Sequence, residues 1–250
     1  MTQLTINIKE KSFSATGKAE KHIAIKDLFF EQAENGFTCI VGPSGCGKTT
    51  LLNIIAELDT QFTGEIKLKT QNSNVNATSY VFQTPRLLPW RTVQENIALA
   101  TNEPETSAES KAAITHILSN LGLDKFVNSY PHHLSLGMQR RAALARAFSV
   151  TAHVLLMDEP FVSLDQPTAR KARELLLKLW HEQPRSILFV THDLSEAIEL
   201  ADRILFLSPA PSRIIADVTV DIQRSERAAN NIAEFKDRLI QNNKQLEPLI

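Results

Sequence analysis

The chain has 250 residues and is 43% apolar, which is enough to bury a large core, as one domain or as a domain with a subdomain. Its formal net charge is −1 and it has no basic block, so composition gives no electrostatic footprint for nucleic acid. No apolar stretch reaches the roughly 18 residues that span a bilayer, and residues 1–10 lack a signal-peptide pattern, so we expect a soluble chain that reaches membranes only through a partner.

The first predicted elements are strands. Residues 4–8 alternate between polar and apolar with period two, which is typical of a half-buried strand, and residues 23–30 look similar. Asn35-Gly36 then forms a turn before an apolar strand at 37–41.

This apolar strand runs into a phosphate-binding loop of the form GxxxxGK[ST], followed by an apolar helical pattern at 51–55. The loop residues are Gly42, Pro43, Ser44, Gly45, Cys46, Gly47, Lys48, Thr49 and Thr50. Glycines let backbone N–H groups turn inward around a phosphate chain, and the helix aims its positive end there. Lys48 would reach the β- and γ-phosphates, and the Thr49 hydroxyl would ligate Mg²⁺. An ordinary glycine-rich turn fits this strand–loop–helix context poorly, so the sequence predicts a nucleoside triphosphate site.

Both cysteines lie in this region, Cys39 in the predicted strand and Cys46 in the loop. They form no disulfide framework and suit a reducing cytosol. For Cys39, a small buried hydrophobe is favoured over any redox role.

The middle of the chain changes from strands to helices. A turn followed by a strand is predicted at 63–68, and a strand ending on Gln83 is predicted at 79–83, with a polar loop at 71–77 between them. Helices separated by Pro89, Pro104 and Pro131 follow at 92–100, 108–121 and 136–148. We therefore expect a helical block at roughly 85–149, inserted into an α/β core.

The last part alternates strands and helices, as expected for a parallel sheet. Strands are predicted at 154–157, 186–190 and 204–207, and helices at 167–183 and 194–201. The strand at 154–157 ends on two carboxylates, which favours a role at the sheet edge over a solvated strand end. Asp158 would hold Mg²⁺, and Glu159 would polarise the water that attacks the γ-phosphate. The tail, 225–250, is predicted to be one helix.

With these motifs in place, the chain resembles the ATP-binding subunit of an ABC transporter over residues 1 to about 220. The loop at 42–50 matches Walker A and 154–159 matches Walker B. By the same resemblance, Gln83 is the Q-loop glutamine and a metal contact, Ser163-Leu164-Asp165 is the D-loop, His192 is the catalytic switch histidine, and Phe13 stacks on adenine. Against the usual solvated role of a lone histidine, the strand-end position favours a functional His192.

The family signature LSGGQ appears as Leu134-Ser135-Leu136-Gly137-Met138. Ser135 suits an N-cap, and its hydroxyl, the Gly137 amide and the helix dipole would bind an anion. The resemblance implies that this site receives the γ-phosphate bound by the opposite subunit of a head-to-tail homodimer. Leu136 and Met138 depart from the pattern. ATP binding is still expected, and the departure bears only on the signature's contact during hydrolysis.

The resemblance implies an α/β fold: a RecA-like P-loop NTPase with a mainly parallel sheet core, an inserted helical subdomain and an N-terminal antiparallel β subdomain. It implies an ABC ATP-binding domain at 1–224, with the helical subdomain at about 85–149, and a short helical tail at 225–250.

The segment Leu87-Leu88-Pro89-Trp90, followed by Val93-x-x-Asn96, is similar to the nitrate-, sulfonate- and taurine-type importer branch. It would line a groove for a helix of the membrane permease, unless Trp90 and the leucines simply fill the helical core. The branch implies a peripheral subunit on the cytoplasmic face of the inner membrane, permease partners and, indirectly, a solute-binding protein.

Other ATPase classes remain as alternatives. A DNA-repair or chromosome ATPase would carry a coiled-coil insertion or basic tracts, and a translation-factor ATPase would contain two cassettes; neither pattern occurs here. A soluble assembly ATPase of the iron–sulfur type shares every hydrolytic motif and is the main competitor. The transported solute is not encoded in these motifs, because selectivity resides in other subunits.

Overall fold

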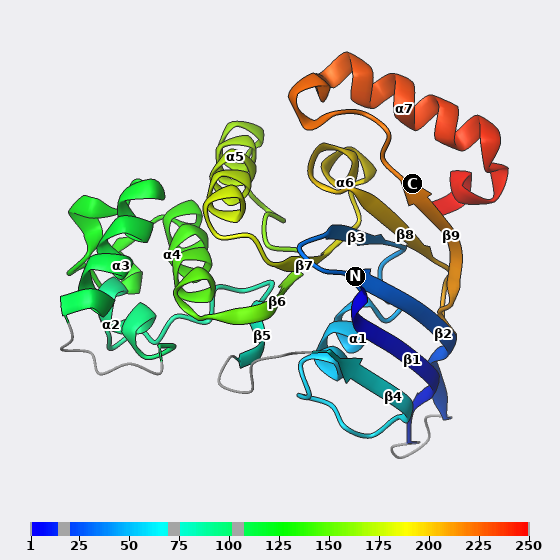
Figure 1. Ribbon diagram of the computed structural model, residues 1–250, viewed down its shortest axis with the longest axis horizontal. Coiled ribbons are helices and arrows are strands. Elements are labelled where there is room, and N and C mark those ends of the chain that lie inside the picture. Colours follow the sequence, from blue (N-terminus) through cyan, green and yellow to red (C-terminus); the bar gives the residue numbers. More distant parts are fainter. Residues whose placement is uncertain (1, 15–20, 70–75, 102–107, 250) are drawn as a thin grey trace. The chain divides into compact units, whose positions relative to one another are not determined.

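The computed structural model describes residues 2–14, 21–69, 76–101 and 108–249 (Figure 1). The chain divides into two compact units, one of Met1–Gln71 with Ser186–Ile250 and one of Asn72–Arg185, and each is described by itself. Pro104 and most of the predicted loop at 71–77 lie outside the described residues, but the last two residues of that loop begin a strand.

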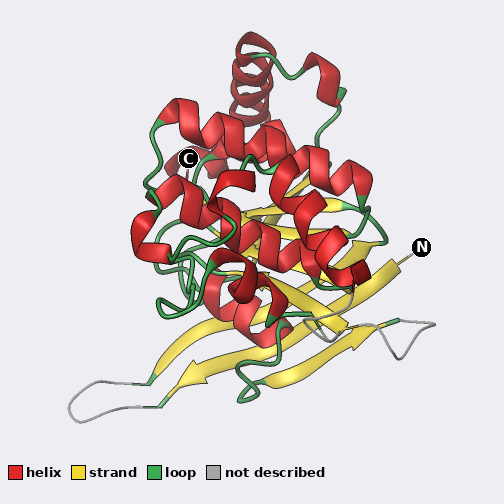
Figure 2. Ribbon diagram, turned by 90° about the vertical axis from the view of Figure 1, so that its left-hand side faces the viewer, coloured by secondary structure: helices red, strands yellow, loops and turns green. Residues whose placement is uncertain are grey.

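The first unit contains an antiparallel sheet of order β2-β1-β4. Its strands are β1 (Thr2–Phe13), β2 (His22–Ala33) and β4 (Thr63–Leu68), and the first two form the long pair visible in Figure 2. Leu4, Ile6 and Ile8 are buried on one face of β1, which is the period-two pattern of a half-buried strand. The strand predictions at 4–8 and 23–30 are confirmed, and both strands extend further. At 63–68 a strand forms as predicted, but it begins at Thr63 and includes the residues predicted as a turn.

The same unit contains the parallel strands β7 (Ser186–Thr191), β3 (Phe37–Val41) and β8 (Arg203–Leu207), in that order. Every residue of β3 and β7 is buried, which explains their continuous apolar sequences. An edge strand, β9 (Ile214–Thr219), pairs antiparallel with β8 and was not predicted. The expected α/β fold, with a parallel core and an antiparallel sheet, is confirmed.

Helices of this unit are α1 (Lys48–Ile55), which follows the loop after β3, α6 (Leu194–Leu200) and α7 (Ala229–Asn242). The prediction of one helix over 225–250 is wrong. Short 3-10 turns at Arg224–Glu226 and Lys244–Leu249 flank α7, and the helix ends at Asn242 because the next residue, Asn243, has non-helical backbone angles.

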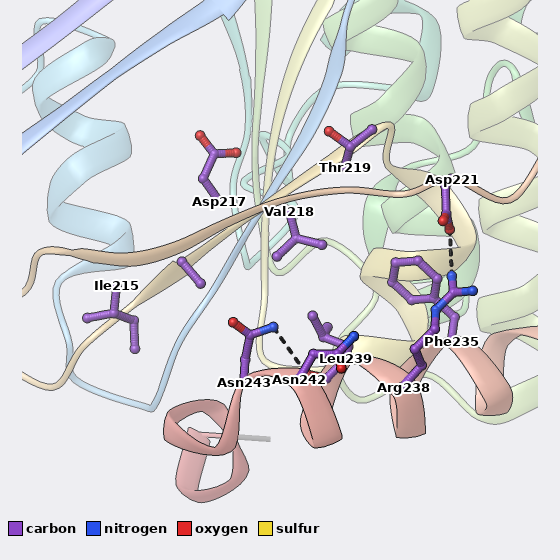
Figure 3. A pocket seen from close by; sticks show the side chains of 11 residues that line it. Ile215, Asp217, Val218, Thr219, Asp221, Phe235, Arg238, Leu239, Asn242 and Asn243 are labelled. Atoms are coloured by element: carbon purple, nitrogen blue, oxygen red, sulfur yellow. Dashed lines mark hydrogen bonds and ion pairs between the residues drawn. The ribbon is translucent and has the colours of Figure 1, made fainter.

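A cavity of about 440 Å³ lies between β9 and α7 (Figure 3). Its rim includes an ion pair in which Arg238 Nη2 lies 2.7 Å from Asp221 Oδ1. None of the residues predicted for nucleotide binding lines this cavity.

The second unit pairs β5 (Asn76–Val81) in parallel with β6 (Ala152–Asp158). Its helices are α2 (Val93–Ala98), α3 (Ala108–Asn120), α4 (Leu136–Ser149) and α5 (Gln166–Glu182), with 3-10 turns at Asp124–Phe126 and Pro131–His133. These helices confirm the helix predictions to within a few residues. In this unit α4 packs against α2, α3, α5 and strand β5 (Figure 1).

Both cysteines are buried. Burial raises the pKa of the Cys39 thiol well above its ordinary value, which keeps the thiol protonated and unreactive. The prediction of a buried hydrophobe is confirmed for Cys39. Over the described part of the chain, no helix has both the length and the apolar character of a membrane span.

Gly64 generates a prediction about stability. It has φ of 140°, and a Cβ added there would lie 2.1 Å from the backbone oxygen of Asn7 in β1. Gly64→Ala should therefore lower the free energy of unfolding by about 2–3 kcal/mol, because strain and a backbone clash add. Urea unfolding measures this, with Lys67→Ala on the exposed side of the same strand as the control. Equal unfolding midpoints for the two variants would contradict the assignment.

Candidate functional site

The phosphate-binding loop is shaped by two glycines with positive φ, Gly45 at 77° and Gly47 at 103°. Gly47 is the N-cap of α1, and Leu51 N donates to its carbonyl oxygen at 2.8 Å. The first amides of α1 have no intrahelical acceptor, and the positive end of the helix dipole points the same way. Together with the exposed Ser44 and Thr49, this geometry is that of an anion-binding loop.

Lys48 is nearly buried, with 6% of its surface exposed. Its Nζ donates to the carbonyl oxygens of Gly42 at 2.8 Å and Pro43 at 3.0 Å, so the loop's own backbone holds the ammonium group. Gly42 permits the tight path, because an added Cβ would lie 3.0 Å from Cys46 Sγ and 3.1 Å from Leu207 Cβ.

The register of β3 and β7 places His192 near this loop. Val41 lies opposite Thr191 in parallel strands, so Gly42 and His192 leave the sheet at the same edge. The first unit therefore brings together two of the predicted elements, Walker A and the switch histidine.

The turn that carries the exposed His192 is held by side chains on both sides. Thr191 Oγ1 donates to Glu196 Oε2 at 2.6 Å and accepts from Asp193 N at 3.0 Å. Asp193 caps α6, because its Oδ1 accepts from Ser195 N at 2.8 Å. His192 is thus fixed by its neighbours while its own side chain is exposed.

The second unit repeats this arrangement with β5 and β6. Val81 lies opposite Met157 in parallel strands, so the segment with Gln83 and the carboxylates of Asp158 and Glu159 leave the sheet at one edge. Asp158 is 4% exposed, whereas Gln83 is exposed. Burial, together with the charge of Asp158, raises the pKa of the Tyr80 hydroxyl above its ordinary value.

Glu159 stands at the start of a turn with unusual backbone. Its φ is 42°, and Ser163 of the predicted D-loop has φ of 64°. Positive φ in non-glycine residues persists only where the surroundings impose it, and such residues cluster at functional sites. The turn ends at Asp165, whose Oδ2 accepts from Thr168 N at 3.3 Å and caps α5.

The predicted signature occupies the start of α4. Ser135 is the N-cap, as expected, and its Oγ accepts from Met138 N at 3.3 Å. Leu136 is 43% exposed, so its side chain lies outside the core. Gly137 packs so tightly on α5 that an added Cβ would lie 2.8 Å from Thr168 Cγ2.

Phe13 is the last residue of β1 and is exposed, with Lys11 Nζ 4.6 Å from its ring centroid. An exposed ring can stack on a base, but Lys11 already contacts it. Residues 15–20 of the loop that follows lie outside the described residues, and the adenine contact stays a prediction.

Asn96 and Arg146 hold the backbone of the segment after Gln83, a role that the sequence did not indicate. Asn96 is 1% exposed; its Nδ2 donates to the carbonyl oxygens of Leu88 and Arg91, and its Oδ1 accepts from Leu88 N at 2.7 Å. Arg146 of α4 donates to Pro85 O at 2.9 Å and Arg86 O at 2.8 Å. An asparagine on the apolar face of α2 was the available sequence signal; Arg146 had none.

Comparison with known families matches residues 25–162 to the model described as ABC transporter. The aliphatic sulfonates import ATP-binding protein SsuB of Bacillus cereus is 38% identical over 84% of this chain and 84% of its own length. The nitrate import ATP-binding protein NrtD of Synechococcus elongatus is 35% identical over 87% of this chain and 83% of its own. A solved dimeric structure of the ATP-binding cassette MJ0796, in a post-hydrolysis state with ADP and Pi, matches with a TM-score of 0.74 and 28% identity, covering 88% of this chain and 100% of that one.

The contact between Gly137 and Thr168 predicts a pair of effects. Gly137→Ala should cost about 1–2 kcal/mol of unfolding free energy, because the new methyl group overlaps Thr168 Cγ2. Adding Thr168→Ser removes that methyl group, keeps the hydroxyl, and should recover most of the loss. A double-mutant cycle in urea measures the coupling. Strictly additive effects would show that the two residues do not press on each other.

Proposed function

Because the chain belongs to the ABC transporter family of ATP-binding proteins, we propose that it is the energy-supplying subunit of an importer of a small solute in the nitrate/sulfonate/taurine-like branch. As a member of this family the chain is an ATPase. The relatives named for sulfonate and nitrate import support the branch. The observation that carries the transport assignment is the exposed Trp90 on the backbone-anchored segment at 87–92.

The proposed hydrolytic chemistry uses the loop and the strand-end carboxylate. The amides of the loop and Lys48 bind the triphosphate, and His192 contacts the γ-phosphate. Glu159 accepts a proton from the attacking water, and the bond from the γ-phosphorus to the bridging oxygen breaks to leave ADP and phosphate. Phe13 stacks on the adenine.

The residues proposed for the metal fit Mg²⁺ chemically. Thr49 supplies a hydroxyl oxygen, Gln83 an amide oxygen and Asp158 a carboxylate, and hard oxygen donors are the ligands that Mg²⁺ prefers. Asp158 is buried, and a buried carboxylate is stable only beside compensating positive charge or hydrogen bonds. The bound metal would neutralise charge that develops on the phosphates.

We further propose a head-to-tail homodimer. Ser135 and the amide of Gly137 stand at the open start of α4, a helix of 14 residues, where the dipole favours an anion. That anion is the γ-phosphate bound by the partner subunit. The domain division proposed is an ATP-binding domain at 1–224, its helical subdomain at about 85–149, and the tail at 225–250.

The segment at 87–92 is the proposed contact with the permease. Trp90 is 70% exposed, which argues against its filling the helical core. Asn96 and Arg146 hold the neighbouring backbone, so the indole stands on an anchored loop. An exposed, rigidly presented tryptophan is typical of an interface anchor. Closure around ATP would thereby move the permease.

These assignments place the chain peripherally on the cytoplasmic face of the membrane, with permease subunits as direct partners and a solute-binding protein as an indirect one. No nucleic-acid role is proposed. The competing function, a soluble assembly ATPase, shares the hydrolytic residues but gives the exposed Trp90 no partner.

Variants of Glu159 and Lys48 distinguish nucleotide binding from ATP hydrolysis. Glu159→Gln should keep ATP affinity while lowering kcat by about 100-fold or more, because the amide accepts no proton. Lys48→Ala should weaken nucleotide binding itself. Equilibrium binding of a fluorescent ATP analogue and steady-state phosphate release measure the two effects. An unchanged kcat in Glu159→Gln would show that Glu159 is not the base. Normal nucleotide affinity in Lys48→Ala would contradict the assignment of the phosphate-binding loop.

Trp90 tests the transport assignment. In affinity purification from membranes, Trp90→Ala should reduce the polytopic membrane protein recovered with the tagged chain by about tenfold or more, the usual cost of losing an interface tryptophan. The unfolding midpoint should not change, since the side chain is exposed. Leu58→Ala, an exposed apolar residue elsewhere, is the control. If the wild-type chain recovers no membrane protein, the assembly ATPase becomes the better assignment.

A further inference from the structure

A buried arginine in α4 has no role in the chemistry described so far. Arg140 is 7% exposed, and burial lowers the pKa of its guanidinium group. Removing such a group from water is costly unless hydrogen bonds replace the lost hydration. Its Nη1 donates to the carbonyl oxygen of Pro160, while its Nε is buried without a partner among the described residues. A charge kept there at this cost points to a role beyond packing.

The acceptor of this bond belongs to the turn that carries Glu159. Pro160 follows Glu159 directly, and a residue before proline is sterically pushed toward extended backbone. Glu159 instead has φ of 42°, which is unfavourable for a non-glycine residue in any context. The turn's own bond is long, with Val162 N 3.3 Å from Glu159 O. An external contact is therefore needed to hold this backbone, and Arg140 supplies one.

The donor of the bond belongs to the start of the signature helix. Arg140 lies three residues after Gly137, less than one helical turn away, and on the same continuous helix. Gly137 itself is packed against Thr168 of α5. One short, packed segment thus joins the anion-binding start of α4 to the carbonyl beside Glu159.

We propose that Arg140 is a positioning residue that sets the Glu159 carboxylate from the start of α4. This inference rests on the proposed function, in which Glu159 accepts the proton of the attacking water. Because the start of α4 would hold the partner subunit's γ-phosphate, the bond also lets occupancy of one nucleotide site adjust the base of the other. Arg140 touches neither nucleotide nor water in this scheme.

The same helix offers a matched control. Arg141 Nη1 donates to a single carbonyl oxygen, that of Leu121, at 2.8 Å, and burial lowers its pKa as well. Leu121 lies just beyond α3, away from the turn of Glu159 in sequence. Replacing Arg141 therefore removes an equivalent arginine–carbonyl bond without touching that turn.

The test measures steady-state ATPase activity and equilibrium ATP affinity of the full chain with Mg²⁺. Arg140→Met should lower kcat about tenfold with ATP affinity unchanged, because misplacing a catalytic group slows chemistry without weakening binding. Arg140→Gln, which retains one donor, should recover part of the loss, and the Hill coefficient should fall in both variants. Arg141→Met should keep kcat and the Hill coefficient while losing comparable stability.

Equal kcat values for Arg140→Met and Arg141→Met would overturn the inference, as would a loss confined to ATP affinity. Should either Met variant fail to fold, Arg140→Gln and Arg141→Gln replace the pair, and a lower kcat in the first is the supporting result. Glu159→Gln is measured alongside. If it hydrolyses ATP normally, the proposed function and the inference both fail; if it is inactive while the two arginine variants match, only the inference fails.

Discussion

The parallel register of buried strands is the constraint on which the site depends. Strands buried on both faces are mostly apolar along their length, and parallel pairing puts the polar residues at or just beyond their ends on one edge of the sheet. Val41 opposite Thr191 aligns the phosphate-binding loop with His192, and Val81 opposite Met157 aligns Gln83 with the carboxylates. A slip by one residue would turn each strand's apolar side chains to the opposite face and move the polar residues out of step.

Arginine–carbonyl bonds are the second organising interaction, and three arginines of α4 make such bonds. Arg140, Arg141 and Arg146 each donate to the backbone of a different segment. Arginine suits this role because its forked guanidinium reaches two acceptors and stays charged when burial lowers its pKa. The carbonyl acceptor is uncharged, so only the guanidinium group has to lose its hydration, whereas an ion pair would require this of two charged groups.

The sequence predicted those features whose cause is local. The glycine-rich loop, the apolar strands and the capped start of α4 each follow from residues within a few positions of one another. The edge strand β9 was not predicted because it is mostly half-exposed and its sequence lacks a clear alternation of polar and apolar residues. The break in the tail at Asn243 was not predicted because no proline or glycine marks it. The hydrogen-bond acceptors of Asn96 and Arg140 were not predictable. Packing determines which carbonyl oxygens Asn96 reaches, and the acceptor of Arg140 lies 20 residues away in the sequence.

The packing at the start of α4 explains why the chain can depart from the family signature at position 136. The retained glycine, Gly137, is the one against which Thr168 presses, and a side chain there would overlap α5. The replaced glycine, now Leu136, stands where a side chain reaches solvent. A leucine at the first helical position also keeps its backbone N–H, the group that an anion would use. Packing therefore constrains position 137 more than position 136, and the anion-binding start of α4 is compatible with the substitution that occurs.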